Sequence, residues 1–211
     1  MSACSGGSNA MSEASPEAAL GHVAEELRRR RQPFALVGGL GVSIRGEVRF
    51  TRDVDVAIVA STDAETEALV RELGAVGYAV IAIVEHGERK RLATVRLRSP
   101  SGIVVDLLAA SSGVEREIVE RAEPVAIEGA GTIPVARAEE LLVMKVLSAT
   151  ETRPQDRMDA INLILINTGL DMDAVRDLLA CVAERGFHRG QALGDKLDAL
   201  LESARRQAPT T

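Results

Sequence analysis

The chain has 211 residues, of which 46% are hydrophobic and 27% charged, a composition that is ordinary for a soluble globular protein. Its formal net charge is −6, so the protein as a whole is not a non-specific binder of nucleic acid, although a local basic face is compatible with that charge. No apolar run approaches the ~18 residues of a membrane span, and two distant cysteines are no disulfide framework. We therefore expect a cytoplasmic protein that does not bind membranes.

The chain begins with a segment that is distinct in composition. Residues 1–14 are rich in Ser, Gly and Ala without periodicity, and we interpret them as a disordered tail or a vector-derived remnant. Ser15 and Pro16 are typical of a helix start, and apolar residues then recur at helical spacing up to an arginine run that ends at Arg31. We expect a core over residues 15–137 and a helical region over residues 138–206.

The most informative stretch is a short apolar run followed by two glycines. Residues 34–37 are long enough for a buried strand and too short for a helix. Gly38 and Gly39 allow a sharp turn and a close approach of the backbone to a ligand. The residues that follow can form about two helical turns, whose N-terminal N–H groups would face whatever lies over the glycines. This arrangement is typical of a phosphate site.

Three aspartates indicate a metal site. Asp53 and Asp55 open the next predicted strand, and side chains two apart on a strand point to the same face. Asp106 interrupts a run that otherwise fits a buried strand, and a buried carboxylate needs a partner or a metal. Oxygen ligands of this kind suit Mg²⁺, which usually keeps substrate phosphates and water as its other ligands.

The remaining core is predicted to alternate helices and strands. We expect a helix from Ser61 through about Leu73, strands over residues 78–84, 92–98 and 103–108, and a peripheral hairpin over residues 124–135. The basic stretch from Arg89 to Arg98 is explained either by charges that protect an exposed edge strand or by contact with substrate phosphate or RNA.

The chain becomes mostly helical from about Ala138. Lys145 interrupts a largely apolar helix face, so it either reaches the rim of the protein or points into a cleft. Asp156 and Asp159 lie one turn apart at the start of the next helix, where a carboxylate is stabilised by the helix dipole even without a function. Two more helices are predicted over residues 171–185 and 189–206.

These pieces resemble the DNA polymerase β-like nucleotidyltransferase superfamily. The resemblance rests on the two glycines, an Arg-Gly pair, a Thr-Arg-Asp-Val-Asp segment, a later aspartate, and a lysine helix followed by an Arg-Pro-x-Asp-x-x-Asp segment. Within the superfamily the chain is most similar to the AbiEii-type nucleotidyltransferases, several of which are toxins of toxin–antitoxin pairs. One departure is Gly39, because the more typical pattern has a serine there.

The resemblance implies an α+β fold, with a mixed sheet of the polymerase β type flanked by helices and followed by a C-terminal helical region. It implies an enzyme that moves a nucleoside monophosphate from a nucleoside triphosphate to an acceptor hydroxyl with one or two Mg²⁺ ions. The implied acceptor is RNA, such as tRNA, or a protein, and an antitoxin is the implied partner. Asp53, Asp55 and Asp106 are the expected metal ligands and catalytic residues, together with Lys145. Expected contacts of the substrate or nucleotide are Gly38, Gly39, Arg45, Thr51, Arg52, Asp156 and Asp159.

Two other readings share these residues. A nucleotidyltransferase that modifies a small molecule, such as an aminoglycoside-like antibiotic, would have the same core but an acidic pocket for a cationic drug. A non-catalytic relative that binds a partner protein is the second alternative, and three intact aspartates argue against it. The nucleotide, the acceptor and the oligomeric state are not determined by the sequence.

Overall fold

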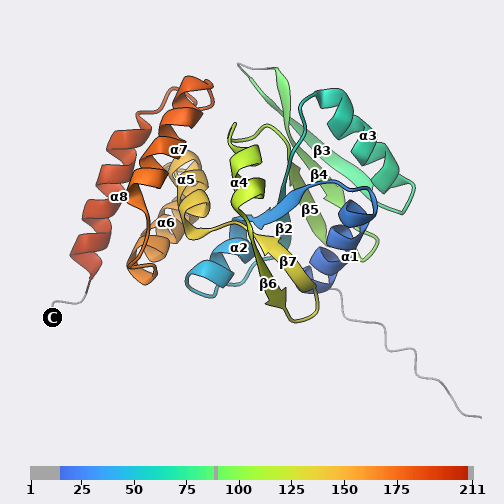
Figure 1. Cartoon of the computed structure of the whole chain (residues 1–211), viewed down its shortest axis with the longest axis horizontal. Coiled ribbons are helices and arrows are strands. Elements are labelled where there is room, and N and C mark those ends of the chain that lie inside the picture. The colour runs from blue at the N-terminus through green and yellow to red at the C-terminus, as the bar shows by residue number, and fades with distance from the viewer. Residues whose placement is uncertain (1–14, 88–89, 209–211) are drawn as a thin grey trace, which may run out of the picture.

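The computed structural model describes residues 15–87 and 90–208, so the predicted tail and Arg89 of the basic stretch lie outside the described part. A mixed sheet of seven strands forms the centre (Figure 1). β1 and β2 pair antiparallel, β5 joins β2 in parallel, and β7 joins β1 in parallel. The strand order is β3 (Ala79–His86), β4 (Arg91–Arg98), β5 (Val104–Leu108), β2 (Asp53–Ile58), β1 (Phe34–Val37), β7 (Gly131–Val135) and β6 (Glu123–Ile127).

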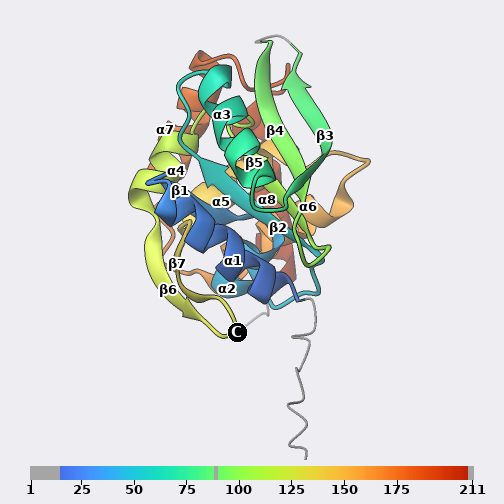
Figure 2. The ribbon, with the colours of Figure 1, turned by 90° about the vertical axis from the view of Figure 1, so that its right-hand side faces the viewer.

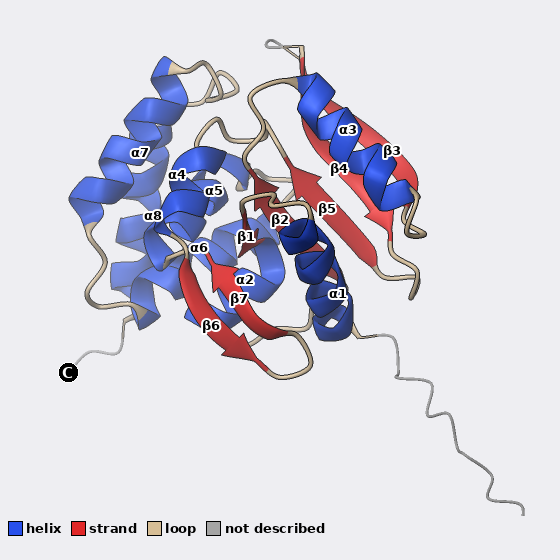
Figure 3. Ribbon diagram, turned by 45° about the vertical axis from the view of Figure 1, so that its right-hand side comes forward, coloured by secondary structure: helices blue, strands red, loops and turns tan. Residues whose placement is uncertain are grey.

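Helices cover both faces of the sheet. Figures 2 and 3 show α1 and α3 on one face, while α5 to α8 gather on the other side of the molecule. No loop separates β1 from α2, because β1 ends at Val37 and α2 begins at Gly38. The helices are α1 (Pro16–Arg29), α2 (Gly38–Arg45), α3 (Asp63–Gly74), α4 (Glu115–Arg121), α5 (Ala138–Ser148), α6 (Pro154–Ile166), α7 (Met172–Glu184) and α8 (Leu193–Gln207).

Successive side chains of β2 point to opposite faces of the sheet, and the two faces meet different parts of the protein. Val54, Val56 and Ile58 are fully buried and pack in the core beneath α1 and α3. Asp53 and Asp55 lie on the opposite face, where Ala57 belongs to the core that contains α5 to α8. β4 and β5 alternate in the same way, with Val95, Leu97, Val105 and Leu107 in the first core. The polar residues of three neighbouring strands therefore share one face.

The α+β fold class is confirmed, but two strands lie elsewhere than expected. β4 runs between β3 and β5, so the arginines of this strand do not protect an edge, and β3 is the edge strand instead. The 123–135 hairpin is not peripheral, because β7 pairs with β1 through Leu36 and Val135 and so extends the central sheet. β1 and β7 lie about a hundred residues apart, so their pairing leaves no local sequence pattern, and the pattern of β4 alone does not show that strands lie on both of its sides.

The C-terminal helices are not packed as a separate body. Ala35, Val37 and Ala57 of the sheet belong to the same hydrophobic core as the apolar residues of α5, α6, α7 and α8. This shared core holds the helix that carries Lys145 against the sheet face that carries the aspartates. Within the described residues, no helix has the length and apolarity needed to cross a membrane.

Candidate active site

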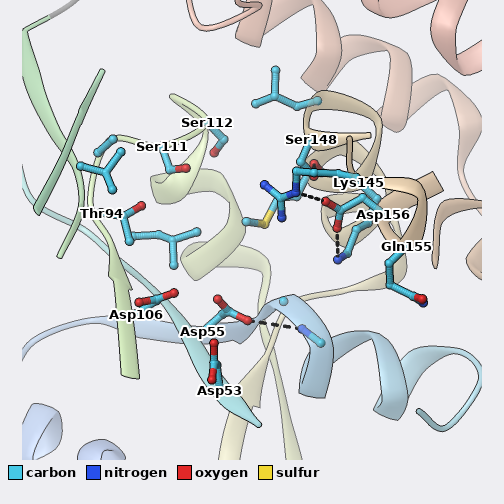
Figure 4. A pocket seen from close by; sticks show the side chains of 18 of the residues that line it. Asp53, Asp55, Thr94, Asp106, Ser111, Ser112, Lys145, Ser148, Gln155 and Asp156 are labelled. Carbon is cyan, nitrogen blue, oxygen red and sulfur yellow. Dashed lines mark hydrogen bonds and ion pairs between the residues drawn. The ribbon is translucent and has the colours of Figure 1, made fainter. Parts of the chain in front are cut away.

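Three aspartates meet on the polar face of the sheet. Asp55 and Asp106 are register partners on the parallel strands β2 and β5, and Asp53 lies two residues before Asp55 on the same face. Figure 4 shows the three carboxylates gathered at one end of a cavity. Asp106 is the most enclosed, with a residue exposure of 7%. The parallel pairing brings together the three aspartates that the sequence analysis had predicted to share a metal site.

The glycine turn supports Asp55 directly. Gly38 has a φ of +63°, and a Cβ atom at this position would lie 1.9 Å from Oδ2 of Asp55, so only glycine fits. The N–H of Gly39 donates to the same oxygen over 3.4 Å. Burial raises the pKa of the Asp55 carboxyl, and the neighbouring charge of Asp106 adds to this effect. A cation between the two carboxylates would relieve that repulsion.

Arg96 of β4 lies among these carboxylates. Its Nε and Nη2 donate to the two oxygens of Asp106 over 2.9 and 2.7 Å, and Nη2 also reaches Oδ2 of Asp53 at 3.4 Å. With Arg96 in this position, no three acidic, His or Cys side chains among the described residues are grouped closely enough to hold a metal ion. The donor set still has the chemistry that Mg²⁺ prefers, since all three groups are carboxylates on rigid strands.

The three aspartates line a cavity of about 1060 Å³. Its wall is shared by the sheet, the glycine turn, the loop before β2, and the helical region. Most of the residues predicted to form the site face this one space. They are Gly38, Gly39, Thr51, Arg52, Asp53, Asp55, Asp106, Lys145 and Asp156.

The space over Gly39 is already used by side chains. A Cβ atom at Gly39 would lie 2.7 Å from Oγ1 of Thr51 and 2.8 Å from Nη2 of Arg49. The sequence analysis had placed a phosphate there, contacted by the backbone N–H alone. In the structure the guanidinium of Arg49 lies over this turn, where it is a hydrogen-bond donor close to the backbone of Gly39.

Lys145 lies in a buried network of charges between α5 and α6. Its Nζ is 2.7 Å from Oδ1 of Asp156 and 2.8 Å from Oδ2 of Asp159, and its side chain is 8% exposed. Arg153 reaches the second oxygen of Asp156 at 2.6 Å, while Arg49 reaches Asp159 at 3.2 Å. The lysine therefore faces the cavity, not the rim, and Figure 4 shows it beside Asp156. Asp159 is the second aspartate that fixes its position.

Three of the predicted contact residues lie apart from the open cavity or at its edge. The guanidinium of Arg45 donates to the backbone carbonyl of Ala136 over 3.1 Å and pairs with Glu123, so it joins α2 to β7 away from the cavity. Asp159 is 1% exposed and lies behind Lys145. Arg52 is exposed at the mouth of the cavity, with its guanidinium over the ring of Phe50.

The sequence analysis gave no role to Arg49 and treated Arg96 only as part of the basic stretch from Arg89 to Arg98. Arg96 alternates with Val95 and Leu97, so the pattern correctly separated the two faces of β4. It could not tell that the polar face is covered by other elements and forms the cavity. Arg49 carried no local signal, because its partner Asp159 lies 110 residues later in the chain.

The sequence pattern of one family matches residues 25–210, which is most of the chain. This family is described as nucleotidyl transferase AbiEii toxin of a type IV toxin–antitoxin system. The chain belongs to the AbiEii nucleotidyltransferase family. It is therefore a nucleotidyltransferase enzyme, as the resemblance implied, and nucleotidyltransferases of this fold generally use divalent metals. Among curated proteins, no sequence matches the chain.

Two solved structures of one protein share the fold, and a third solved structure is similar at a lower score. The antibiotic-resistance factor ANT(2'')-Ia in complex with adenylyl-2''-tobramycin has a TM-score of 0.51 at 16% identity, covering 80% of this chain and 97% of that one. A solution structure of the same factor has a TM-score of 0.50 at 20% identity, with coverages of 90% and 96%. An antigenic nucleotidyltransferase-like protein from Paracoccidioides brasiliensis has a TM-score of 0.46 at 19% identity, with coverages of 87% and 93%. At these identities the likeness concerns the fold.

Proposed function

We propose that this nucleotidyltransferase moves a nucleoside monophosphate from a nucleoside triphosphate to a hydroxyl of RNA, such as tRNA, or of a protein. It acts with Mg²⁺ as a toxin that a cognate antitoxin restrains. The observation that supports this most strongly is the meeting of Asp53, Asp55 and Asp106 on one sheet face, in a cavity that Lys145 also enters. The reaction takes place in the cytoplasm, where the triphosphate and cellular RNA are found.

The roles of the residues follow from their placement. Asp53, Asp55 and Asp106 would hold one or two Mg²⁺ ions, which would neutralise the charge that develops on the phosphates. Arg96 would have to give up its contacts with the oxygens of Asp106 and Asp53 for a metal to bind there. Lys145 and Arg49 face the cavity from two sides, so they are placed to neutralise the triphosphate, while Asp156 and Asp159 keep Lys145 oriented.

The transfer itself is an in-line displacement at the α-phosphorus. The acceptor hydroxyl gives its proton to a carboxylate oxygen of Asp106 as the new oxygen–phosphorus bond forms. The bond between the α-phosphorus and the bridging oxygen breaks, and its electron pair leaves with pyrophosphate.

Thr51 holds the start of β2 in place through its Oγ1, which donates to the carbonyl of Asp53 over 3.4 Å.

The test is incubation of the purified protein with Mg²⁺, each α-labelled nucleoside triphosphate in turn, and total cellular RNA. A variant with Asp53→Ala and Asp55→Ala is the control. Label that enters RNA, and does so only with intact aspartates, supports the proposal and identifies the nucleotide. Label in protein indicates a protein acceptor. If no label is transferred and calorimetry detects no nucleotide binding, the catalytic function is contradicted. That result would favour the non-catalytic, partner-binding relative.

A small-molecule acceptor is the second candidate, favoured by the shared fold of a factor solved with adenylyl-2''-tobramycin. A cationic aminoglycoside needs carboxylates in its own part of the pocket. In this cavity the aspartates of the sheet are grouped at the transfer site, and the charged residues farther along the wall include Arg153 and Arg189. A polyanionic acceptor matches this distribution better.

A further inference from the structure

The cavity has a second end that the reaction scheme above does not use. Figure 4 shows Ser111 and Ser112, from the loop after β5, at a distance from Asp53, and Ser148 at the end of α5. Arg153, just before α6, and Arg189, in the connection between α7 and α8, line the same cavity. This end is therefore built from hydroxyls and arginines, in contrast to the carboxylates on the sheet.

Arg189 is held in place by its surroundings. Its backbone has a φ of +53°, and its Nη2 donates to the carbonyl of Ser111 over 3.0 Å. The connection that carries it is pressed onto the loop after β5, where Phe187 packs so closely that a Cβ atom at Gly113 would lie 2.3 Å from its ring. Arg185 adds a hydrogen bond to the carbonyl of Gly113 over 2.6 Å. The guanidinium of this exposed residue is thus tethered to the cavity wall by one hydrogen bond.

Carboxylates offset the positive charge at this end only in part, because Asp156 pairs with Arg153 and the charge of Glu115 acts on Arg189. Among the described residues, Arg189 forms no ion pair, and its guanidinium has four further N–H groups beyond the bond to Ser111. Arg153 pairs with Asp156, but that carboxylate is shared with Lys145. Burial lowers the pKa of Arg189, and the charge of Arg153 contributes to this effect. Burial and Arg189 also lower the pKa of Lys196 behind it. An anion bound here would relieve this repulsion.

We propose that Arg189 and Arg153 form an anion subsite that binds a backbone phosphate of a single-stranded RNA acceptor. The proposal rests on the proposed nucleotidyl transfer, and it selects RNA among the acceptors. The triphosphate of the nucleotide is held at the other end, near the aspartates and Arg49. A cationic antibiotic would be repelled by two arginines, whereas a phosphodiester pairs with both.

The test measures how RNA affinity depends on salt, because each phosphate contact that is lost reduces the slope. The probe is a fluorescein-labelled single-stranded RNA of about ten nucleotides, followed by anisotropy in EDTA without nucleotide at about 50 to 200 mM salt. The variant is Arg189→Gln. The matched control is Arg176→Gln, which removes the same charge from α7, where Arg176 pairs with Asp198 at the exposed surface.

The subsite predicts that Arg189→Gln reduces the slope of log K against log salt by about 0.7, the value for one contact to a single strand, and that Arg176→Gln leaves it unchanged. Equal slopes for the two variants, or no RNA binding by the unmodified protein, would overturn the subsite. Binding of a nucleoside triphosphate with Mn²⁺ is measured in parallel by calorimetry. If it persists while the RNA slopes are equal, only the subsite is wrong; if it is absent, the proposed transfer itself is contradicted.

Discussion

The two ends of the cavity differ in charge and in how the chain builds them. The acidic end, with Asp53, Asp55 and Asp106, lies on two adjacent strands, and Arg96 on a third strand is its counter-charge. The basic end, with Arg153 and Arg189, lies on connections between helices. One cavity thus holds the proposed metal ligands and the proposed phosphate ligands in separate places, so that a nucleoside triphosphate and an anionic acceptor would bind at different ends.

The two ends of the cavity also differ in how precisely the backbone positions their side chains. Strand register fixes the spacing of the carboxylates, and chemistry at the α-phosphorus requires that accuracy. The basic end is formed by loops, which adapt to ligands more readily and vary more among related proteins. We therefore expect changes at the acidic end to affect the rate of transfer and changes at the basic end to affect recognition of the acceptor.

The largest effect is expected from Asp106→Asn. This change removes a charged metal ligand and the proposed proton acceptor, so the rate of nucleotidyl transfer should fall by about 10²–10³-fold or more, as for other groups that stabilise transition-state charge. Initial rates with labelled triphosphate measure it. Asp173→Asn, on the exposed side of α7, is the control. A rate within about threefold of the unmodified protein would contradict the role given to Asp106.

Lys145→Met is expected to reduce the free energy of unfolding more than the loss of an exposed ion pair does. It leaves Asp156 and Asp159 buried without their shared cation, and such a loss costs about 3 kcal/mol or more of unfolding free energy. Urea unfolding followed by circular dichroism measures it. Arg176→Ala, which breaks an exposed pair, should cost at most about 1 kcal/mol. Equal losses in the two variants would show that the buried network does not stabilise the fold.

Arg96→Gln sharpens the comparison at the acidic end. Arg96 competes with a metal for oxygens of Asp106 and Asp53, so its removal should tighten Mn²⁺ binding by about tenfold, the equivalent of one charge-assisted hydrogen bond. Calorimetric titration of the nucleotide-free protein measures this, with Arg71→Gln on the surface of α3 as control. Unchanged or weaker binding would mean that Arg96 keeps its contacts when the metal is bound.

The smallest effect is a pH dependence of stability in EDTA. Because the pKa of Asp55 is raised in the folded protein, this residue destabilises the fold increasingly as pH rises from its ordinary value of 3.8 toward the raised pKa. Asp55→Asn should therefore raise the melting temperature at pH 7.5 and change it little at pH 3.5. Melting curves of both proteins at the two pH values measure this difference. A gain that is larger at pH 3.5 would contradict the sign of the shift.

Local patterns were sufficient for the secondary structure and for the chemistry of the acidic end. The strand at 53–58, the turn at Gly38 and the helix that carries Lys145 follow from hydrophobic periodicity, glycine and spacing, which act over a few residues. The shared face of Asp53 and Asp55 follows from the two-residue period of a strand. For Asp106, the sequence showed only that a buried carboxylate needs a partner.

Tertiary packing decided which distant segments of the chain contact one another. The parallel register of Asp55 with Asp106, the pairing of Arg49 with Asp159 and the contact of Arg189 with Ser111 each join residues separated by 50 residues or more. Alternation predicted that Arg96 lies on the polar face of its strand, but the position of β4 inside the sheet decided that this face is a cavity wall. Such contacts are selected by the burial of two hydrophobic cores together, and no short stretch of sequence contains that information.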